Sequence, residues 1–235
     1  MSSLPEAVAG EGSSVHAARQ RQSLSTLDRR IIRELARVRF ATREQFAHWY
    51  EIDASTVSRH LNCLLASGYL LCHSHSRPAV WGLSLPTAQL MQPEITSWRE
   101  PSWAVMANAC HANQAEIELG MEHKGFQMAK RLSLLKQGLH PVLGEYGAMD
   151  GDNISYLVLV DDYRMQSRRM EKAWTRRHTP SAKFWADPTG RCWRDVVNQF
   201  YVVSTDSYRT DAHRFWSVVH RMPAKCLSIA PLWRP

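Results

Sequence analysis

Five polar side chains between residues 55 and 62 have the types and spacing of a helix face that contacts DNA. Val57, Leu61, Leu64 and Leu65 fall at helical spacing and define the face that turns toward a core. The opposite face is small, polar and basic, and it consists of Ser55, Thr56, Ser58, Arg59 and Asn62. Short hydroxyls and amides reach base edges or phosphates in a major groove, and an arginine pairs with guanine. We therefore predict that this face reads double-stranded DNA.

A second stretch, residues 163 to 194, has the composition of a phosphate-binding segment. It carries nine Lys or Arg against two Asp or Glu, and a helix is predicted over Tyr163–Trp174. The candidate DNA contacts in this stretch are Arg164, Arg168, Arg169, Lys172, Arg176 and Arg177. The alternative is a solvated basic face whose charges pair with Asp161, Asp162 or the acidic middle of the chain.

The elements that must hold the first face in place are predicted within residues 25–92. The T-x-x-Q sequence Thr42–Gln45 marks one helix start, Asp53 marks a second start after a turn at 51–53, and Gly68 marks the end of that second helix. A preceding helix is predicted over Leu27–Val38. These three helices form a helix-turn-helix pattern.

A β-hairpin, the wing, is predicted directly after these helices. Two apolar runs, Tyr69–Cys72 and Ala79–Leu83, flank a polar loop. Further candidate DNA contacts lie at the start of the middle helix and in the wing, and they are Arg43, His73, His75 and Arg77. The prediction is a winged helix-turn-helix, and the alternative is a three-helix packing module that touches no nucleic acid.

The charge of the chain favours a polyanionic partner. The 235 residues carry a formal net charge of +7, with a pI near 9.4. The excess of Lys and Arg over Asp and Glu is +3 in residues 1–92, −3 in residues 93–160 and +7 in residues 161–235. A nucleic acid could therefore contact both the N-terminal and the C-terminal part.

The rest of the chain predicts a small α/β layer domain, so the fold class is α+β or α/β. Helices are expected at 104–122, 163–174, 192–198 and 210–220, and strands at 126–135, 156–160 and 200–204, with turn residues at 150–153. The predicted parts are a mobile tail (1–24), the winged helix-turn-helix (25–92), a linker (93–103), the α/β domain (104–222) and a C-terminal tail (223–235).

Four features together resemble the replication-relaxation family of plasmid and conjugative-element proteins. They are the predicted winged helix, the sequence W-G-L-S at Trp81–Ser84 that closes the wing, His111-Ala112-Asn113 within a helix, and a strand that ends in Asp161-Asp162. The resemblance covers most of residues 24–220. It implies a winged helix followed by a domain similar to restriction endonucleases, and a role in plasmid replication or in relaxation of transfer origins. It also implies that Asp150 or Asp152, together with Asp162, occupies the acidic positions of that domain.

A nuclease of this kind needs two acids that bind Mg²⁺ and a lysine near the strand end. The chain offers Asp162-Tyr163-Arg164, and an arginine stays protonated and cannot act as a base. Our leading hypothesis is therefore a non-enzymatic, sequence-specific DNA-binding protein that regulates transcription or assists at an origin. The alternative is a Mg²⁺-dependent nicking enzyme that uses Asp150, Asp152 and Asp162. A third hypothesis is a protein-interaction module.

Cofactors and disulfides are not expected from the residue pattern. The five cysteines are odd in number and form no C-x-x-C pair, and the histidines lack zinc-ligand spacing. Neither a signal peptide nor a membrane span is predicted, and we expect a cytoplasmic protein. The hypothesis admits a homodimer and contacts with relaxosome, replication or transcription proteins.

Overall fold

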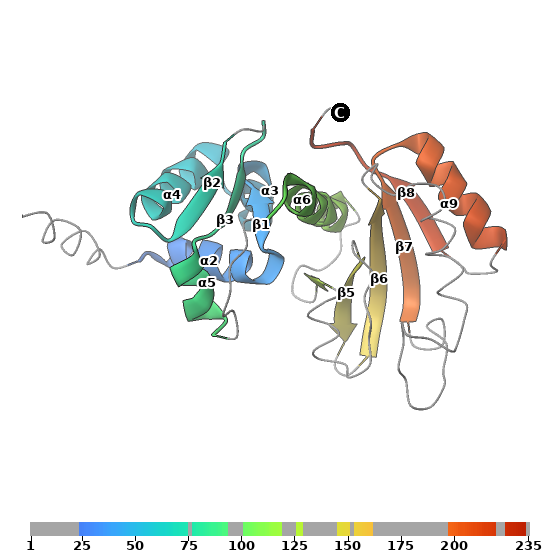
Figure 1. Ribbon diagram of the computed structural model, residues 1–235, viewed down its shortest axis with the longest axis horizontal. Coiled ribbons are helices and arrows are strands. Elements are labelled where there is room, and N and C mark those ends of the chain that lie inside the picture. Colours follow the sequence, from blue (N-terminus) through green and yellow to red (C-terminus); the bar gives the residue numbers. More distant parts are fainter. Residues whose placement is uncertain are drawn as a thin grey trace, which may run out of the picture.

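The computed structural model describes residues 24–74, 77–93, 101–118, 126–128, 145–150, 153–161, 197–219 and 224–233. These residues form a mixed α and β protein in which helices surround two small sheets (Figure 1). Among the described helices, none is both long enough and apolar enough to cross a membrane.

The N-terminal part combines four helices with a three-stranded antiparallel sheet. Its elements are α2 (Thr26–Val38), β1 (Phe40–Thr42), α3 (Arg43–Tyr50), α4 (Ala54–Ala66), β2 (Leu70–His73), β3 (Val80–Leu83) and α5 (Leu85–Met91). The strand order is β1-β3-β2, and β2 and β3 form the predicted hairpin. Strand β1 was not predicted from the sequence.

Local capping explains where these helices begin and end, and it confirms the predicted boundaries. The hydroxyl of Thr42 accepts the amide of Gln45, and the Gln45 side chain in turn accepts the amide of Thr42. Asp53 caps α4, and Gly68, with φ of 78°, follows its end in the left-handed conformation that favours glycine. Helix α2 starts at a second capping box, formed by Ser25 and Asp28.

One hydrophobic core holds the N-terminal part together. Its largest fully buried aliphatic and aromatic side chains come from α2, α3, α4 and β2, and they are Ile31, Leu35, Phe46, Leu61, Leu64 and Leu70. Gly82 of β3 lies opposite Phe40 of β1, and a Cβ at Gly82 would lie 3.0 Å from two carbons of the Phe40 ring. Glycine is therefore the residue that lets β1 and β3 pair beside this ring.

The C-terminal part is a five-stranded mixed sheet with the order β4-β5-β6-β7-β8. The strands are β4 (Phe126–Met128), β5 (Glu145–Asp150), β6 (Asn153–Asp161), β7 (Val197–Ser204) and β8 (Ala224–Ser228), and the helices are α6 (Trp103–Glu118) and α9 (Ser207–Val219). Strands β4, β5 and β6 pair antiparallel, whereas β6, β7 and β8 pair parallel. The turn predicted at 150–153 is confirmed, because Asp150 pairs with Asn153 across it.

Two predictions for this part are wrong. Residues 197 and 198, which were assigned to a helix, begin strand β7, because Val197 pairs with Ile154 of β6. The predicted C-terminal tail contains β8, which pairs with β7 through Phe200–Ser204. Both segments take their conformation from a partner strand that is distant in sequence, and local propensity does not show such pairing.

Helix α6 lies between the two parts (Figure 1). One side packs Met106, Ala109 and Cys110 against β1 and β3, and the other packs Ala112 and Ala115 against the sheet. Polar contacts also tie α6 to the N-terminal part. Gln45 donates to the Cys110 carbonyl at 2.7 Å, Asn113 donates to the Phe40 carbonyl at 2.8 Å, and Arg37 lies 3.3 Å from the Glu116 carboxylate.

Candidate nucleic-acid interface

Helix α4 presents the predicted DNA-contacting residues on the side away from the core. Val57, Leu61 and Leu64 are buried, and they fix the orientation of the helix, whereas Leu65, which was predicted on the same face, is 38% exposed. On the other side Ser55, Arg59 and Asn62 are exposed, while Thr56 and Ser58 are half-buried. Ser55, Ser58, Arg59 and Asn62 are spaced i, i+3, i+4 and i+7, so they form one stripe along the helix.

Two arginines contact hydroxyl groups on this side of α4. Arg59 donates from Nη2 to the Thr56 hydroxyl at 3.1 Å, and Arg43, from the start of α3, donates from Nη1 to the Ser58 hydroxyl at 3.5 Å. Arg43 also forms a 2.6 Å ion pair with Glu44, in which both side chains are about half exposed. A pair this exposed contributes little to stability, so Arg43 can exchange Glu44 for a phosphate at small cost.

Asp53 places a carboxylate at the start of α4, where it caps the helix. Its carboxylate accepts the amides of Ser55 and Thr56 and also the Ser55 hydroxyl. The pKa of Asp53 lies below its ordinary value, and the largest cause is the hydrogen bond from the Ser55 side chain. The helix start therefore carries a negative charge, which suits amino groups on base edges better than phosphates.

Of the three hairpin candidates, the structure describes His73 and Arg77. The His73 ring is half-buried and lies edge-on to the Phe40 ring at 6.4 Å, so packing already engages it. Arg77, in the loop between β2 and β3, is exposed. His75 lies outside the described residues, as do Arg164, Arg168, Arg169, Lys172, Arg176 and Arg177.

Of the three candidate metal-binding acids, Asp150 is the one that lies within the described residues. Asp150 pairs with Asn153 at one end of β6, whereas Asp162 directly follows Asp161 at the other end. Asp152 and Asp162 themselves lie outside the described residues.

A buried acid, base and arginine cluster that the sequence analysis did not identify lies at the carboxyl end of β6. Asp161 Oδ2 is 2.8 Å from His213 Nε2 and 2.8 Å from Arg209 Nε, both from α9. The side chains of Asp161 and His213 are fully buried. Residues alternate along a strand, so Asp161 faces α9 on the side of the sheet opposite to Val158 and Val160, which pack with α6.

The cluster has a structural role: it attaches α9 to the sheet. Asp161 Oδ1 has no hydrogen-bond partner among the described residues. Within those residues no group of three or more His, Cys, Asp or Glu side chains could hold a metal ion. The signal in the sequence was the Asp161-Asp162 pair at the end of a strand. His213 gave no signal, because it lies 52 positions away along the chain.

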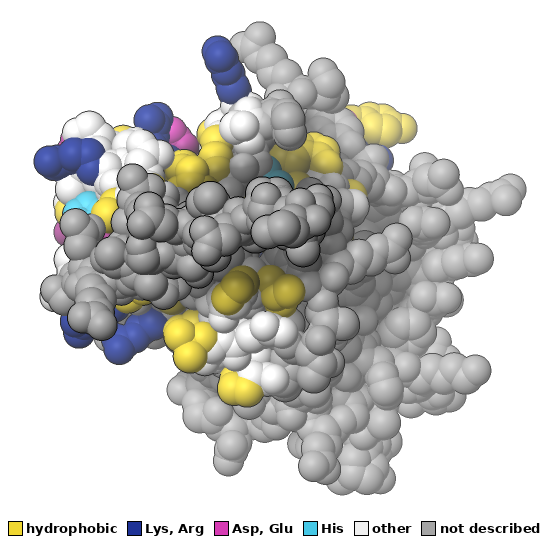
Figure 2. Space-filling model, turned by 60° about the vertical axis from the view of Figure 1, so that its left-hand side comes forward, with side chains coloured by type: hydrophobic (Ala, Val, Ile, Leu, Met, Phe, Trp, Pro, Cys, Tyr) yellow, Lys and Arg dark blue, Asp and Glu magenta, His cyan; other side chains and the backbone are white. Residues whose placement is uncertain are grey.

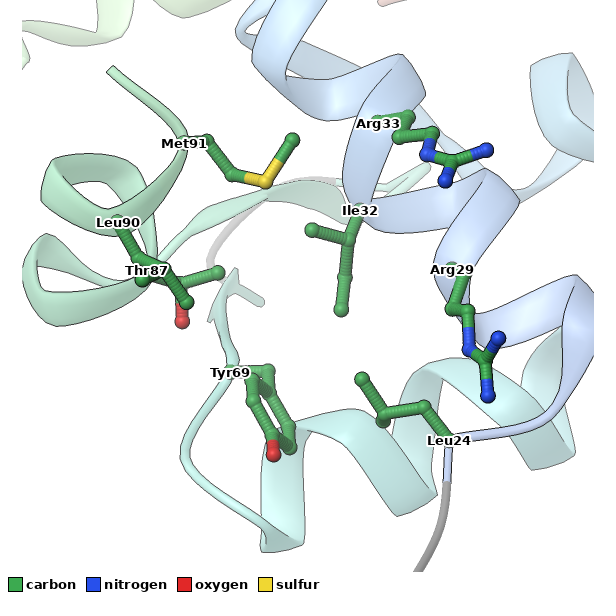
Figure 3. A pocket seen from close by; sticks show the side chains of 8 residues that line it. All are labelled: Leu24, Arg29, Ile32, Arg33, Tyr69, Thr87, Leu90 and Met91. Carbon is green, nitrogen blue, oxygen red and sulfur yellow. The ribbon is translucent and has the colours of Figure 1, made fainter. Parts of the chain in front are cut away.

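A shallow pocket lies between α2 and α5 (Figure 3). Its volume is about 200 Å³, and it is lined by Leu24, Arg29, Ile32, Arg33, Tyr69, Thr87, Leu90 and Met91. Binding sites for small molecules usually have volumes of roughly 300 to 1,000 Å³. We therefore assign no ligand to this pocket.

The described surface is basic at several separate points. In the face shown in Figure 2, Lys and Arg side chains lie near the edge of the view, with hydrophobic side chains exposed between them.

No model of a known protein family matches the chain, and no curated protein matches it. The resemblance to the replication-relaxation family therefore stays a prediction.

Proposed function

We propose that residues 25–92 form a winged helix-turn-helix that binds double-stranded DNA with sequence specificity. Three features of the fold support this proposal. Helices α3 and α4 are joined by a three-residue turn, strands β2 and β3 form an antiparallel hairpin after α4, and β1 lies between α2 and α3. In this arrangement α4 is the recognition helix, and the hairpin is the wing that lies along the DNA backbone.

The observation that carries the proposal is the polar stripe on α4. Its members, Ser55, Ser58, Arg59 and Asn62, are held at fixed spacing by a helix whose other face is locked into the core. A rigid scaffold of this kind can place short donors and an arginine against base edges without a large loss of side-chain entropy. Arg43 adds a charge for a phosphate beside the same groove.

The biological role that follows is regulation of transcription, or assistance at a replication or transfer origin, in a plasmid or other mobile element. This role rests on the resemblance to the replication-relaxation family. We do not propose the nicking reaction that uses Asp150, Asp152 and Asp162, because the sequence has Arg164 where such a site needs a lysine. Double-stranded DNA is the partner, and no metal cofactor is needed for binding.

The proposal is tested by replacing Arg59, which can make a bidentate contact with guanine. The cognate duplex is first selected from a random pool with the full chain. Arg59→Ala should then weaken binding to that duplex by about 1 to 3 kcal/mol, as measured by fluorescence anisotropy.

Arg33→Ala is the matched control, because Arg33 is exposed on α2 beside the pocket between α2 and α5 (Figure 3). This variant loses the same charge and should keep most of the affinity for the selected duplex. Equal losses in the two variants would show that α4 does not read the sequence. A failure to select any duplex would overturn sequence-specific binding itself.

A further inference from the structure

Helix α9 buries polar side chains and exposes apolar ones, which is the reverse of the usual arrangement in a surface helix. Its buried positions are polar, namely Thr210, His213 and Ser217. Its exposed positions include four large hydrophobic side chains, with exposed fractions of 81% for Tyr208, 61% for Phe215, 76% for Val218 and 50% for Val219. Surface helices normally turn their apolar stripe toward the core and their polar residues toward water.

The polar residues on the inner face are explained by contacts within the chain. His213 pairs with Asp161, Thr210 donates to the Asp206 carbonyl at 2.9 Å, and Ser217 donates to the Arg214 carbonyl at 2.7 Å. The apolar residues on the outer face have no such explanation. Tyr208, Phe215, Val218 and Val219 are spaced i, i+7, i+10 and i+11, which is the spacing of a seam between two packed helices.

We propose that the outer face of α9 is the interface of a homodimer, in which two α9 helices pack antiparallel across a twofold axis. A twofold interface requires a self-complementary surface, because each residue meets its counterpart in reverse order. With the axis near residues 212 and 213, Tyr208 meets the end of the partner helix that carries the two valines. Asp211 then meets the partner's Arg214, and Arg214 meets the partner's Asp211.

The charges beside the seam fit this arrangement. Asp211 and Arg214 form a 2.7 Å ion pair within α9, and their side chains remain 69% and 61% exposed. Because both are accessible, they can exchange this internal pair for two pairs across the axis without a buried unpaired charge. A partner of one charge sign would satisfy only one of the two residues, whereas a second copy satisfies both.

The size of the patch sets the expected strength of the dimer. Four side chains of this kind bury on the order of 500 Å² per subunit, or about 1,000 Å² in total, which is the lower limit for a specific interface. We therefore expect dissociation constants on the order of micromolar rather than nanomolar. The proposal is independent of DNA binding, and α9 and α4 lie at opposite ends of the molecule, so the pairing leaves α4 accessible (Figure 1).

The test is the mass of the full chain in solution, measured by sedimentation velocity from roughly 1 to 200 μM, a range that spans the expected dissociation constant. The wild-type mass should rise from monomer to dimer over this range. Phe215→Glu should remain a monomer throughout, because it places like charges at the seam. Leu90→Glu is the control, since Leu90 is 77% exposed on α5, outside the proposed interface, and this variant should dimerise like the wild type.

A charge exchange tests the orientation of the two helices. Asp211→Arg alone should weaken the dimer, and the combination of Asp211→Arg with Arg214→Asp should restore it, because the partners remain complementary. Circular dichroism confirms that each variant is folded. A wild-type protein that stays monomeric at every concentration would overturn the proposal. The same holds if Phe215→Glu dimerises normally, if Leu90→Glu abolishes the dimer, or if the double exchange fails to restore it.

Discussion

Asp28 performs two structural tasks with one carboxylate. It completes the capping box of α2 with Ser25, and its Oδ1 lies 2.8 Å from Nδ1 of His60 on α4. Burial by itself raises the pKa of Asp28, but the hydrogen bonds from Ser25 and His60 outweigh it, so the pKa lies below its ordinary value. The charged form of this group therefore holds α2 against α4.

A lowered pKa has a definite consequence for acid stability. The contribution of Asp28 to the free energy of unfolding is fully present above its unfolded pKa of about 3.9, and it is lost as the pH falls through the folded value. We expect Asp28→Asn to lower stability at pH 6 and to reduce the loss of stability between about pH 5 and 2. Urea unfolding at several pH values measures both effects. Glu44→Gln, at an exposed carboxylate, should keep the acid dependence of the wild type.

At the scale of elements, the sequence was most informative where both partners of an interaction lie in one short window. The Thr42 and Gln45 capping box spans three residues, and the cap at Asp53 and the end of α4 at Gly68 are equally local. These features were predicted correctly, as were the hairpin of β2 and β3 and most of β6 and α9.

The missed features depend on pairs that are distant in sequence. Gln45 was predicted as a cap, but its side chain also donates to the Cys110 carbonyl, 65 residues away. The Asp161 and His213 pair spans 52 residues, and β8 exists because β7 offers it a parallel edge. Propensity and periodicity describe one segment at a time, so neither identifies these contacts. The candidate DNA-contacting stripe on α4 could be predicted because a helix fixes its own spacing.

The basic segment 163–194 is predicted to form a second contact with DNA. If its arginines and lysine contact phosphates, replacing Arg168, Arg169 and Lys172 with alanine should weaken binding about equally on all duplexes. The slope of log affinity against log salt should also flatten by roughly 0.9 for each lost phosphate contact. Anisotropy titrations at four or more salt concentrations measure this slope. An unchanged slope would show that the segment serves another partner.

At the scale of the whole molecule, α6 makes the two parts depend on each other. Arg37 of α2 reaches Glu116 of α6, whose side chain is only 2% exposed. Removing one partner of a buried ion pair leaves a desolvated charge and costs about 3 to 5 kcal/mol. We expect Arg37→Met to destabilise the protein by the lower part of this range, because Arg37 is itself partly accessible.

Hydrogen exchange measured by mass spectrometry can show whether Arg37→Met destabilises both the N-terminal and the C-terminal part. Peptides from α4 and from β7 should both exchange faster in Arg37→Met, because the shared helix couples their opening. Arg33→Met, on the exposed side of α2, should change neither. Faster exchange in α4 alone would mean that the two parts open independently.

The contact of Trp233 with the N-terminal part has a consequence for synthesis on the ribosome. Its Nε1 donates to the Pro78 carbonyl across 155 residues, and its ring packs against Trp103 and His111. At 5 to 20 residues per second, translation from Pro78 to Trp233 takes roughly 8 to 30 s. The first core can fold within that time, but Phe40 and Val80, which pack in the same cluster as Trp233, lack this cover until it emerges. A nascent chain therefore presents an uncovered apolar surface for seconds, which is long enough for a chaperone to bind.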